Sequence, residues 1–121
     1  MHSPRYHVIF DLGSCRPERL SDVAGLKQFL LDLVDGVGMH PLIDPVVAEG
    51  IPENPGLSGF VIIDYSHCSI HTFTAHNEAM IDIFSCKPYD RIFAKKMCYE
   101  YFGMPESEVR EQEVWWESDA G

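Results

Sequence analysis

Nucleophilic and basic side chains are concentrated between positions 58 and 86 of this 121-residue chain. Ser58 precedes a β-forming run, Ser66 and His71 follow that run, and Cys86 lies downstream. Serine hydroxyls and cysteine thiols act as nucleophiles, and histidine accepts and releases a proton near neutral pH. The density of these groups indicates that this part of the chain carries out chemistry.

The spacing of Ser66 and His71 restricts how they can be arranged. A step of five residues puts two side chains on opposite faces of an unbroken strand. A turn near residues 65–67 removes this difficulty and puts Ser66 at a hairpin tip, where backbone strain and exposure favour chemistry. His67 and His71 have a four-residue spacing that metal ligands can use, but no third ligand follows at a suitable spacing, so we expect no metal.

Length and composition indicate one globular domain spanning residues 1–121, because 45% hydrophobic residues suffice for a core. The formal charge of -10 disfavours nucleic acid and anionic membranes as partners and is compatible with a small cationic substrate. No apolar run approaches the roughly 20 residues of a membrane helix, and the N-terminus lacks a signal-peptide layout. Four widely spaced cysteines without a Cys-x-x-Cys pair indicate free thiols. We therefore expect a cytoplasmic protein.

The pattern of apolar residues predicts strands grouped around two helices. The first helix begins at a Ser21 cap and ends near Gly36 and Gly38, and the second begins at an Asp90 cap and ends at Gly103. The predicted strands are 6–12, 42–47 (an edge strand interrupted by proline), 60–63, 68–73, 79–84 and 109–116. This order predicts an α+β fold, a two-layer sandwich in which two helices cover one face of a mainly antiparallel sheet.

Several short motifs occur together at fixed spacing. Gly-Leu-Ser-Gly at 56–59 is followed by Ser-His at 66–67, by Ser-Ile-His-Thr at 69–72 and by Asp-Ile-Phe-Ser-Cys at 82–86. With the opening run at 6–15, these motifs resemble the S-adenosylmethionine decarboxylases of the small prokaryotic type. The resemblance covers about the first three quarters of the chain.

The resemblance implies a precursor that cleaves itself between Tyr65 and Ser66. The hydroxyl of Ser66 would attack the carbonyl carbon of Tyr65 and turn the peptide bond into an ester. Elimination from that ester would leave a pyruvoyl group at the start of residues 66–121, and residues 1–65 would remain bound. The pyruvoyl group, derived from Ser66, is thus the cofactor that the resemblance implies.

The resemblance also assigns roles to three other residues. Ser58 would stabilise the oxyanion during processing, and His71 would move the α-proton. The pyruvoyl group would form a Schiff base with an amine substrate and accept electrons as carbon dioxide leaves, after which Cys86 would donate a proton. A homodimer, or a dimer of processed αβ units, with active sites built from both protomers is implied as well, acting in polyamine (spermidine) synthesis.

Three positions depart from the family pattern. Tyr65 replaces a glutamate before the processed serine, Pro52 replaces a phenylalanine that stacks on adenine, and Ala75 replaces a glutamate that holds the ribose. Two nucleoside contacts are therefore missing, which leaves the substrate open between S-adenosylmethionine and a basic amino acid, ornithine or arginine. Candidate substrate-binding residues are His67 and Glu78.

A function from a different class remains open. A homologue that no longer cleaves itself would serve as a binding or regulatory subunit. The two hypotheses differ in whether the peptide bond before Ser66 is broken.

Overall fold

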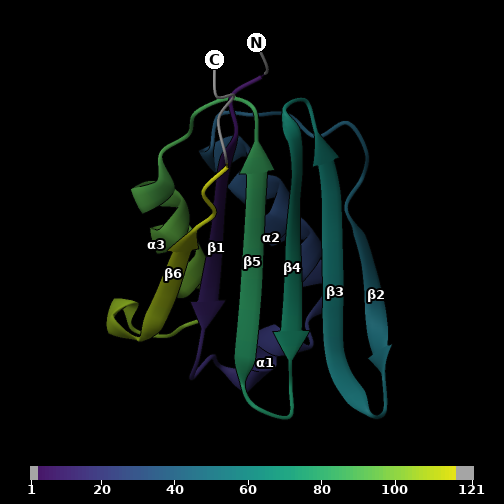
Figure 1. The fold of residues 1–121 in the computed structure, drawn as a ribbon. Coiled ribbons are helices and arrows are strands. Elements are labelled where there is room, and N and C mark those ends of the chain that lie inside the picture. The colour runs from purple at the N-terminus through teal and green to yellow at the C-terminus, as the bar shows by residue number, and fades with distance from the viewer. Residues whose placement is uncertain (1–2, 117–121) are drawn as a thin grey trace.

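The computed structural model describes residues 3–116 and is built on a six-stranded sheet in which all neighbouring strands are antiparallel. The strand order is β2-β3-β4-β5-β1-β6 (Figure 1). The strands are β1 (Tyr6–Leu12), β2 (Val46–Ile51), β3 (Asn54–Ile63), β4 (Ser66–Phe73), β5 (Glu78–Ser85) and β6 (Val109–Glu113).

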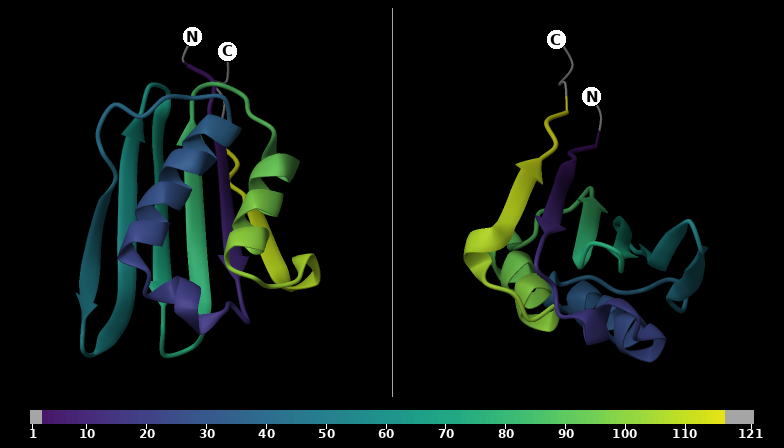
Figure 2. Two further views of the ribbon diagram at one scale, coloured as in Figure 1. Left: turned by 180° about the vertical axis from the view of Figure 1, so that it is seen from behind. Right: turned by 90° about the horizontal axis from the view of Figure 1, so that it is seen from below.

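The helices lie on one face of this sheet, and the other face is left open (Figure 2). They are α1 (Pro17–Leu20), α2 (Val23–Gly36) and α3 (Arg91–Tyr101), and the 3₁₀ turn η1 (Glu106–Glu108) precedes β6. The predicted α+β two-layer sandwich is therefore confirmed. The short helix α1 was not among the two helices predicted from the sequence.

Side-chain caps and glycine fix the ends of the two long helices. Asp22 caps α2 by accepting a hydrogen bond from the Gly25 amide, one residue later than the predicted cap at Ser21. Asp90 caps α3 as predicted. Gly103, which follows the last turn of α3, has a φ of 65°, a conformation that glycine adopts without steric cost.

Alternate residues of the central strands face the helices and form the core. Each fully buried aliphatic or aromatic side chain contributes about 1.5–3 kcal/mol relative to exposure. The fully buried members include Val8, Phe10, Leu12, Leu20, Leu26, Leu30, Leu33, Ile63, Ile70, Ile81, Ile83 and Phe102. The intervening residues of the same strands point to the open face, so the period of two in the sequence separates core from open face.

Five strands differ from their predicted bounds. Strands β3, β4 and β5 extend beyond the predicted 60–63, 68–73 and 79–84, and β3 begins six residues earlier than predicted, at Asn54. The edge strand begins at Val46, not at 42, because Pro45 has no amide hydrogen with which to continue a ladder. In the segment directly before Pro45, the pairing with β3 is limited to an isolated bridge between Pro41 and Ile63. The last strand ends at Glu113, short of the predicted 116. One further hydrogen bond, from the Val114 amide to the His7 carbonyl, joins the chain to β1 after that point.

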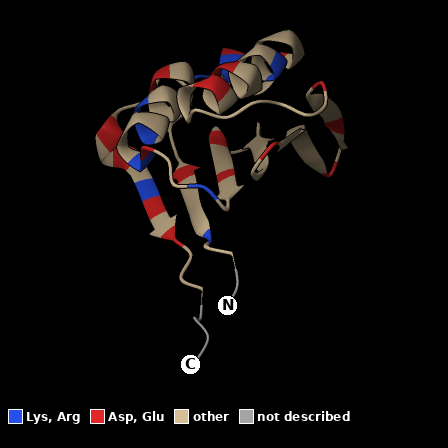
Figure 3. Cartoon of the chain, turned by 90° about the horizontal axis from the view of Figure 1, so that it is seen from above, with Lys and Arg blue, Asp and Glu red and all other residues tan. Residues whose placement is uncertain are grey.

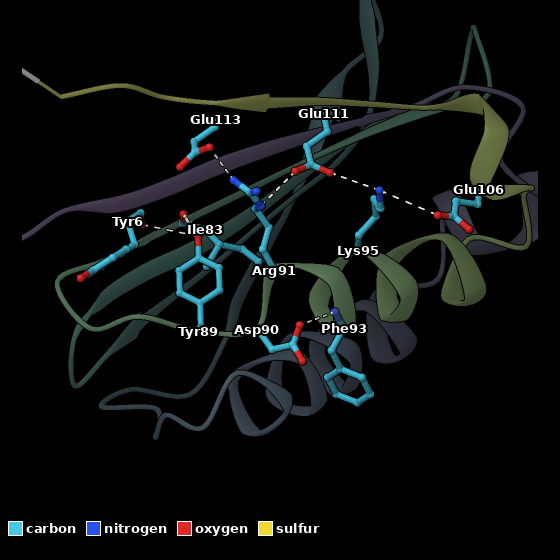
Figure 4. A network of polar contacts seen from close by, with 10 residues as sticks. All are labelled: Tyr6, Ile83, Tyr89, Asp90, Arg91, Phe93, Lys95, Glu106, Glu111 and Glu113. Carbon is cyan, nitrogen blue, oxygen red and sulfur yellow. Dashed lines mark hydrogen bonds and ion pairs between the residues drawn. The ribbon is translucent and has the colours of Figure 1, made fainter.

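Three ion pairs hold β6 against α3, and a fourth joins α3 to η1 (Figure 4). Arg91 pairs with Glu111 at 3.1 Å and with Glu113 at 2.7 Å, and Lys95 lies 3.3 Å from Glu111 and 3.9 Å from Glu106. Such solvent-exposed pairs contribute little individually, so we assign them an orienting role for this edge strand.

Charged residues lie mainly on the helices and on β6, with a few on the central strands, such as Glu78 and Asp82 of β5 (Figure 3). Strands β3 and β4 contain no Lys, Arg, Asp or Glu. Within residues 3–116, no helix has both the length and the apolarity needed to span a bilayer.

Candidate active site

The β3–β4 hairpin carries the serine at which cleavage is expected. Ile63 and Ser66 pair across a two-residue turn, Asp64–Tyr65, so that Ser66 is the first residue of β4. This is the hairpin-tip position predicted from the sequence. Ser66 has a φ of 144°, which costs a non-glycine residue on the order of 1–3 kcal/mol. The backbone is therefore strained at the peptide that joins Tyr65 to Ser66.

Residues that follow α2 hold this turn from one side. The amide of His40 donates to Oδ1 of Asp64 at 3.0 Å, and the amide of Asp64 donates to the carbonyl of His40 at 3.0 Å. Nδ1 of His40 lies 3.2 Å from Oδ2 of the same carboxylate. The backbone hydrogen bond from His40 is the main reason that the pKa of Asp64 is lowered, and the imidazole adds to the effect.

The segment after β5 holds the turn from the other side. The amide of Cys86 donates a 3.0 Å hydrogen bond to the carbonyl oxygen of Tyr65, the oxygen that would carry negative charge if Ser66 attacked. This donor could not be predicted from the sequence, because a backbone amide leaves no residue-type signal. Only the register that pairs Ser66 with Ser85 brings Cys86 to this carbonyl.

Ser58 and His71 form a second group on the open face. They pair across β3 and β4, and Ser58 Oγ lies 2.9 Å from Nδ1 of His71, within hydrogen-bond distance. The neighbouring Thr72 is buried; its hydroxyl accepts from the Leu57 amide at 2.8 Å and donates to the Leu20 carbonyl at 2.7 Å. These bonds fix the backbone on both sides of the serine–histidine pair.

The two glycines of the Gly-Leu-Ser-Gly segment permit close packing around Ser58. Gly56 has a φ of 149°, and a Cβ there would collide with the backbone carbonyl of Thr72. A Cβ on Gly59 would lie 2.9 Å from Cδ1 of Leu30, so glycine lets α2 approach β3. The two glycines therefore let β3 lie close to Thr72 of β4 before Ser58 and close to α2 after it.

The two groups do not meet within one chain. Ser66 pairs with Ser85, whereas His71 pairs with Met80, five residues further along an unbroken β4. At roughly 3.3 Å per residue this separation is about 16 Å. The turn that was expected to reconcile Ser66 with His71 lies before Ser66, so it puts the serine at a tip without bringing the histidine to it.

The other candidate residues lie at both ends of the sheet. His67 stands on the open face between the rings of Phe60 and Phe84, with ring centroids 5.6 Å away on each side. Glu78 begins β5 at the far end, opposite Phe73. Within residues 3–116, no three His, Cys, Asp or Glu side chains are grouped as a metal site would require.

Ala75 and Pro52, the two departures from the nucleoside contacts, also lie at the far end of the sheet. Ala75 is exposed in the β4–β5 turn, and Pro52 is exposed in the β2–β3 turn. The two turns are adjacent, because the Thr74 amide donates to the Pro55 carbonyl.

The fold and site together define a two-layer α+β protein with a strained serine on a buttressed hairpin turn. A family model described as S-adenosylmethionine decarboxylase matches residues 6–113. The chain belongs to this family, which confirms the resemblance found in the sequence.

Relatives agree with this assignment, and a solved structure agrees with the fold. The S-adenosylmethionine decarboxylase proenzyme of Geobacillus kaustophilus is 31% identical over 105 residues, which cover 87% of this chain and 82% of the relative. The proenzyme of Thermodesulfovibrio yellowstonii is 32% identical over 88 residues, covering 71% of this chain and 62% of the relative, less than two thirds of its length. The crystal structure of the adenosylmethionine decarboxylase from Aquifex aeolicus VF5 has the same fold, with a TM-score of 0.75, 20% identity, and 98% and 99% of the two chains covered.

The contact between Asp64 and His40 predicts how acid affects the turn. Asp64→Asn keeps an oxygen that can accept from the His40 amide but removes the negative charge. Because the folded protein lowers the pKa of Asp64 from its ordinary value of 3.8, the stabilisation by this carboxylate is present at neutral pH and is lost as the pH falls through the lowered pKa. Measured in Ser66→Ala chains, which keep the turn uncut, the protein with Asp64 should therefore unfold at a higher temperature than Asp64→Asn near neutral pH, and the difference should shrink below about pH 4. Thermal unfolding followed by circular dichroism across this pH range measures the difference; one that grows on acidification would contradict the assignment.

Proposed function

We propose that the chain is the precursor of a pyruvoyl-dependent decarboxylase that cleaves itself between Tyr65 and Ser66. The observation that carries the proposal is the strained Ser66 on its hairpin turn, with the preceding carbonyl already hydrogen-bonded to the Cys86 amide. The family to which the chain belongs supports it, because its relatives are named proenzymes.

The residues around the turn fit the chemistry of cleavage. Attack by Ser66 Oγ on the Tyr65 carbonyl carbon forms an ester and frees the amino group of Ser66. The Cys86 amide donates to the oxygen that becomes negative during this step. Removal of the Ser66 α-proton then breaks the Cβ–Oγ bond, and Tyr65 leaves as a carboxylate. Uptake of water and loss of ammonia convert the remaining group to pyruvoyl.

The pyruvoyl group supplies the electron sink that decarboxylation of an amine-bearing substrate requires. Cys86 is the thiol suited to donate a proton there, because it is the only one of the four cysteines, all within the described residues, that is not buried. Burial raises the pKa of Cys15 to about 11 and that of Cys68 to about 12, and it raises the pKa of Cys98 as well. These three thiols are packing residues.

The functional unit that we propose is a homodimer in which each site is shared. Within one chain Ser58 and His71 are about five residues of strand away from Ser66, so a second copy has to supply them. The open sheet face suits a second copy, because Phe60, Ile62 and Met80 are at least 36% exposed there and the adjoining strands β3 and β4 carry no charge. Two such faces packed together would bury the face of each sheet that the helices leave uncovered.

The proposed substrate is S-adenosylmethionine, the compound for which the family is named, and the proposed setting is polyamine synthesis in the cytoplasm. A basic amino acid, ornithine or arginine, is a second candidate. Ala75 has no carboxylate to hold a ribose, and Pro52 has no aromatic ring to stack on adenine. Either substrate is a small cation, which suits a chain of net charge -10.

Cleavage tests the central proposal. Purified wild-type protein should give two masses, those of residues 1–65 and of residues 66–121 with a pyruvoyl start, because Ser66 is strained and its target carbonyl is polarised. The Ser66→Ala variant should give the full-length mass, since it lacks the attacking hydroxyl. Intact mass spectrometry distinguishes these outcomes. A wild-type chain that remains full-length would instead favour the homologue that acts as a binding or regulatory subunit.

Mixed dimers test whether the site is shared. Ser66→Ala and His71→Ala chains should each remain largely uncleaved alone. In a mixed dimer, one of the two sites combines the intact Ser66 of the His71→Ala chain with the intact His71 of the other. Co-expression should therefore restore cleavage to the His71→Ala chain, up to about half of it when dimers form at random. Cleavage that is not restored, in samples shown to contain mixed dimers, would mean that Ser66 and His71 act within one chain.

Release of carbon dioxide identifies the substrate. Cleaved protein should release labelled carbon dioxide from S-adenosylmethionine. If the contacts missing at Pro52 and Ala75 prevent binding of the nucleoside, it should release it from ornithine or arginine instead. Lysine, also basic, serves as a comparison. Ala75→Glu should lower the KM for the nucleoside relative to that for an amino acid, because only the nucleoside has a ribose, and a charged hydrogen bond to it contributes about 1.5–3 kcal/mol. Turnover of none of the four compounds would contradict the proposed activity.

A further inference from the structure

Lys87 contacts the residue before the cleavage point through its charge. Its ammonium lies 5.1 Å from the centroid of the Tyr65 ring, in the range of a cation–π interaction. The same ammonium donates a 3.2 Å hydrogen bond to the carbonyl of Gly38. Lys87 therefore joins Tyr65 to the segment that follows α2.

The backbone of Lys87 is itself held in place. The buried Ser85 hydroxyl accepts from the Lys87 amide at 2.9 Å and donates to the Lys87 carbonyl at 2.8 Å. This pair of bonds fixes the chain on both sides of Cys86, the residue whose amide donates to the Tyr65 carbonyl. The side-chain contact and the backbone contact thus reach Tyr65 from one rigid segment.

The position of the Tyr65 ring bears on the reaction, because the side chain and the carbonyl share one Cα. Tyr65 is 39% exposed, so packing alone does not fully restrict its ring. A ring held under Lys87 would keep the carbonyl bonded to the Cys86 amide for a larger fraction of the time. The positive charge also suits the step that breaks the Ser66 Cβ–Oγ bond, because the electron pair of that bond leaves on the Tyr65 carboxylate.

We propose that Lys87 is a positioning residue for self-cleavage, acting through the ring of Tyr65. This inference rests on the proposed function and names a residue outside the motif that carried the family resemblance. Lys87 acts by its charge over the ring, so arginine can replace it and an uncharged chain of similar length cannot.

The rate of cleavage of freshly made precursor tests the proposal. Protein from cell-free synthesis is sampled over time, and the full-length and cleaved masses are quantified. Lys87→Met should slow cleavage by roughly twofold to tenfold, from the usual strength of a cation–π contact, and Lys87→Arg should restore most of the rate. Tyr65→Phe should cleave like wild type because it keeps the ring, and Tyr65→Leu should be slow.

The double variant separates positioning from a general effect on the fold. In the Tyr65→Leu background, Lys87→Met should cause no further loss, because the contact is already absent. Lys96→Met, at an exposed lysine of α3, is the matched control and should leave the rate unchanged. Thermal unfolding of each variant shows whether stability has changed with it.

The outcomes separate the two proposals. A wild-type chain that remains intact overturns the proposed function and this inference together. Wild-type cleavage with an unchanged rate in Lys87→Met overturns the inference alone. An equal loss in the Tyr65 and Tyr65→Leu backgrounds also overturns it, because Lys87 would then act by some route other than the ring.

Discussion

The antiparallel register of β3, β4 and β5 is the constraint on which the rest of the structure depends. It puts Ser58 beside His71 in one row of the open face and pairs Ser66 with Ser85 at the end of the sheet. A slip of one residue would turn the whole open face of a strand toward the helices and expose its core residues. The hydrophobic contacts with α2 therefore determine the position of the reactive groups, although they make no contact with a substrate.

The hairpin turn before Ser66 is held by segments that are far apart in the sequence. His40, after α2, binds Asp64, while Cys86, after β5, binds the Tyr65 carbonyl. An unfavourable backbone conformation persists only where the surroundings over-determine it. The strained conformation of Ser66 is thus held by contacts from several parts of the fold. It lies next to the peptide bond whose cleavage we propose.

Elements with strong local signals were predicted well from the sequence. The strand at 6–12 and the Asp90 cap were found with their observed bounds, because alternation and capping are short-range effects. The edge strand was placed about four residues early, since the β-forming residues before Pro45 have no continuous partner to pair with. The cap at Asp22 was assigned to the adjacent Ser21, because both residue types serve this position equally well.

The sequence by itself determined the layer architecture and the family, and it supplied the candidate reactive side chains, because these depend on periodicity and on which groups can react. Only the tertiary structure decided which of them meet. It joined Ser58 to His71, kept both away from Ser66 of the same chain, and gave the Tyr65 carbonyl a donor in the amide of Cys86. The physical reason is that these contacts run between strands, through backbone groups that every residue type shares, and their register is set by the packing of the entire sheet on its helices.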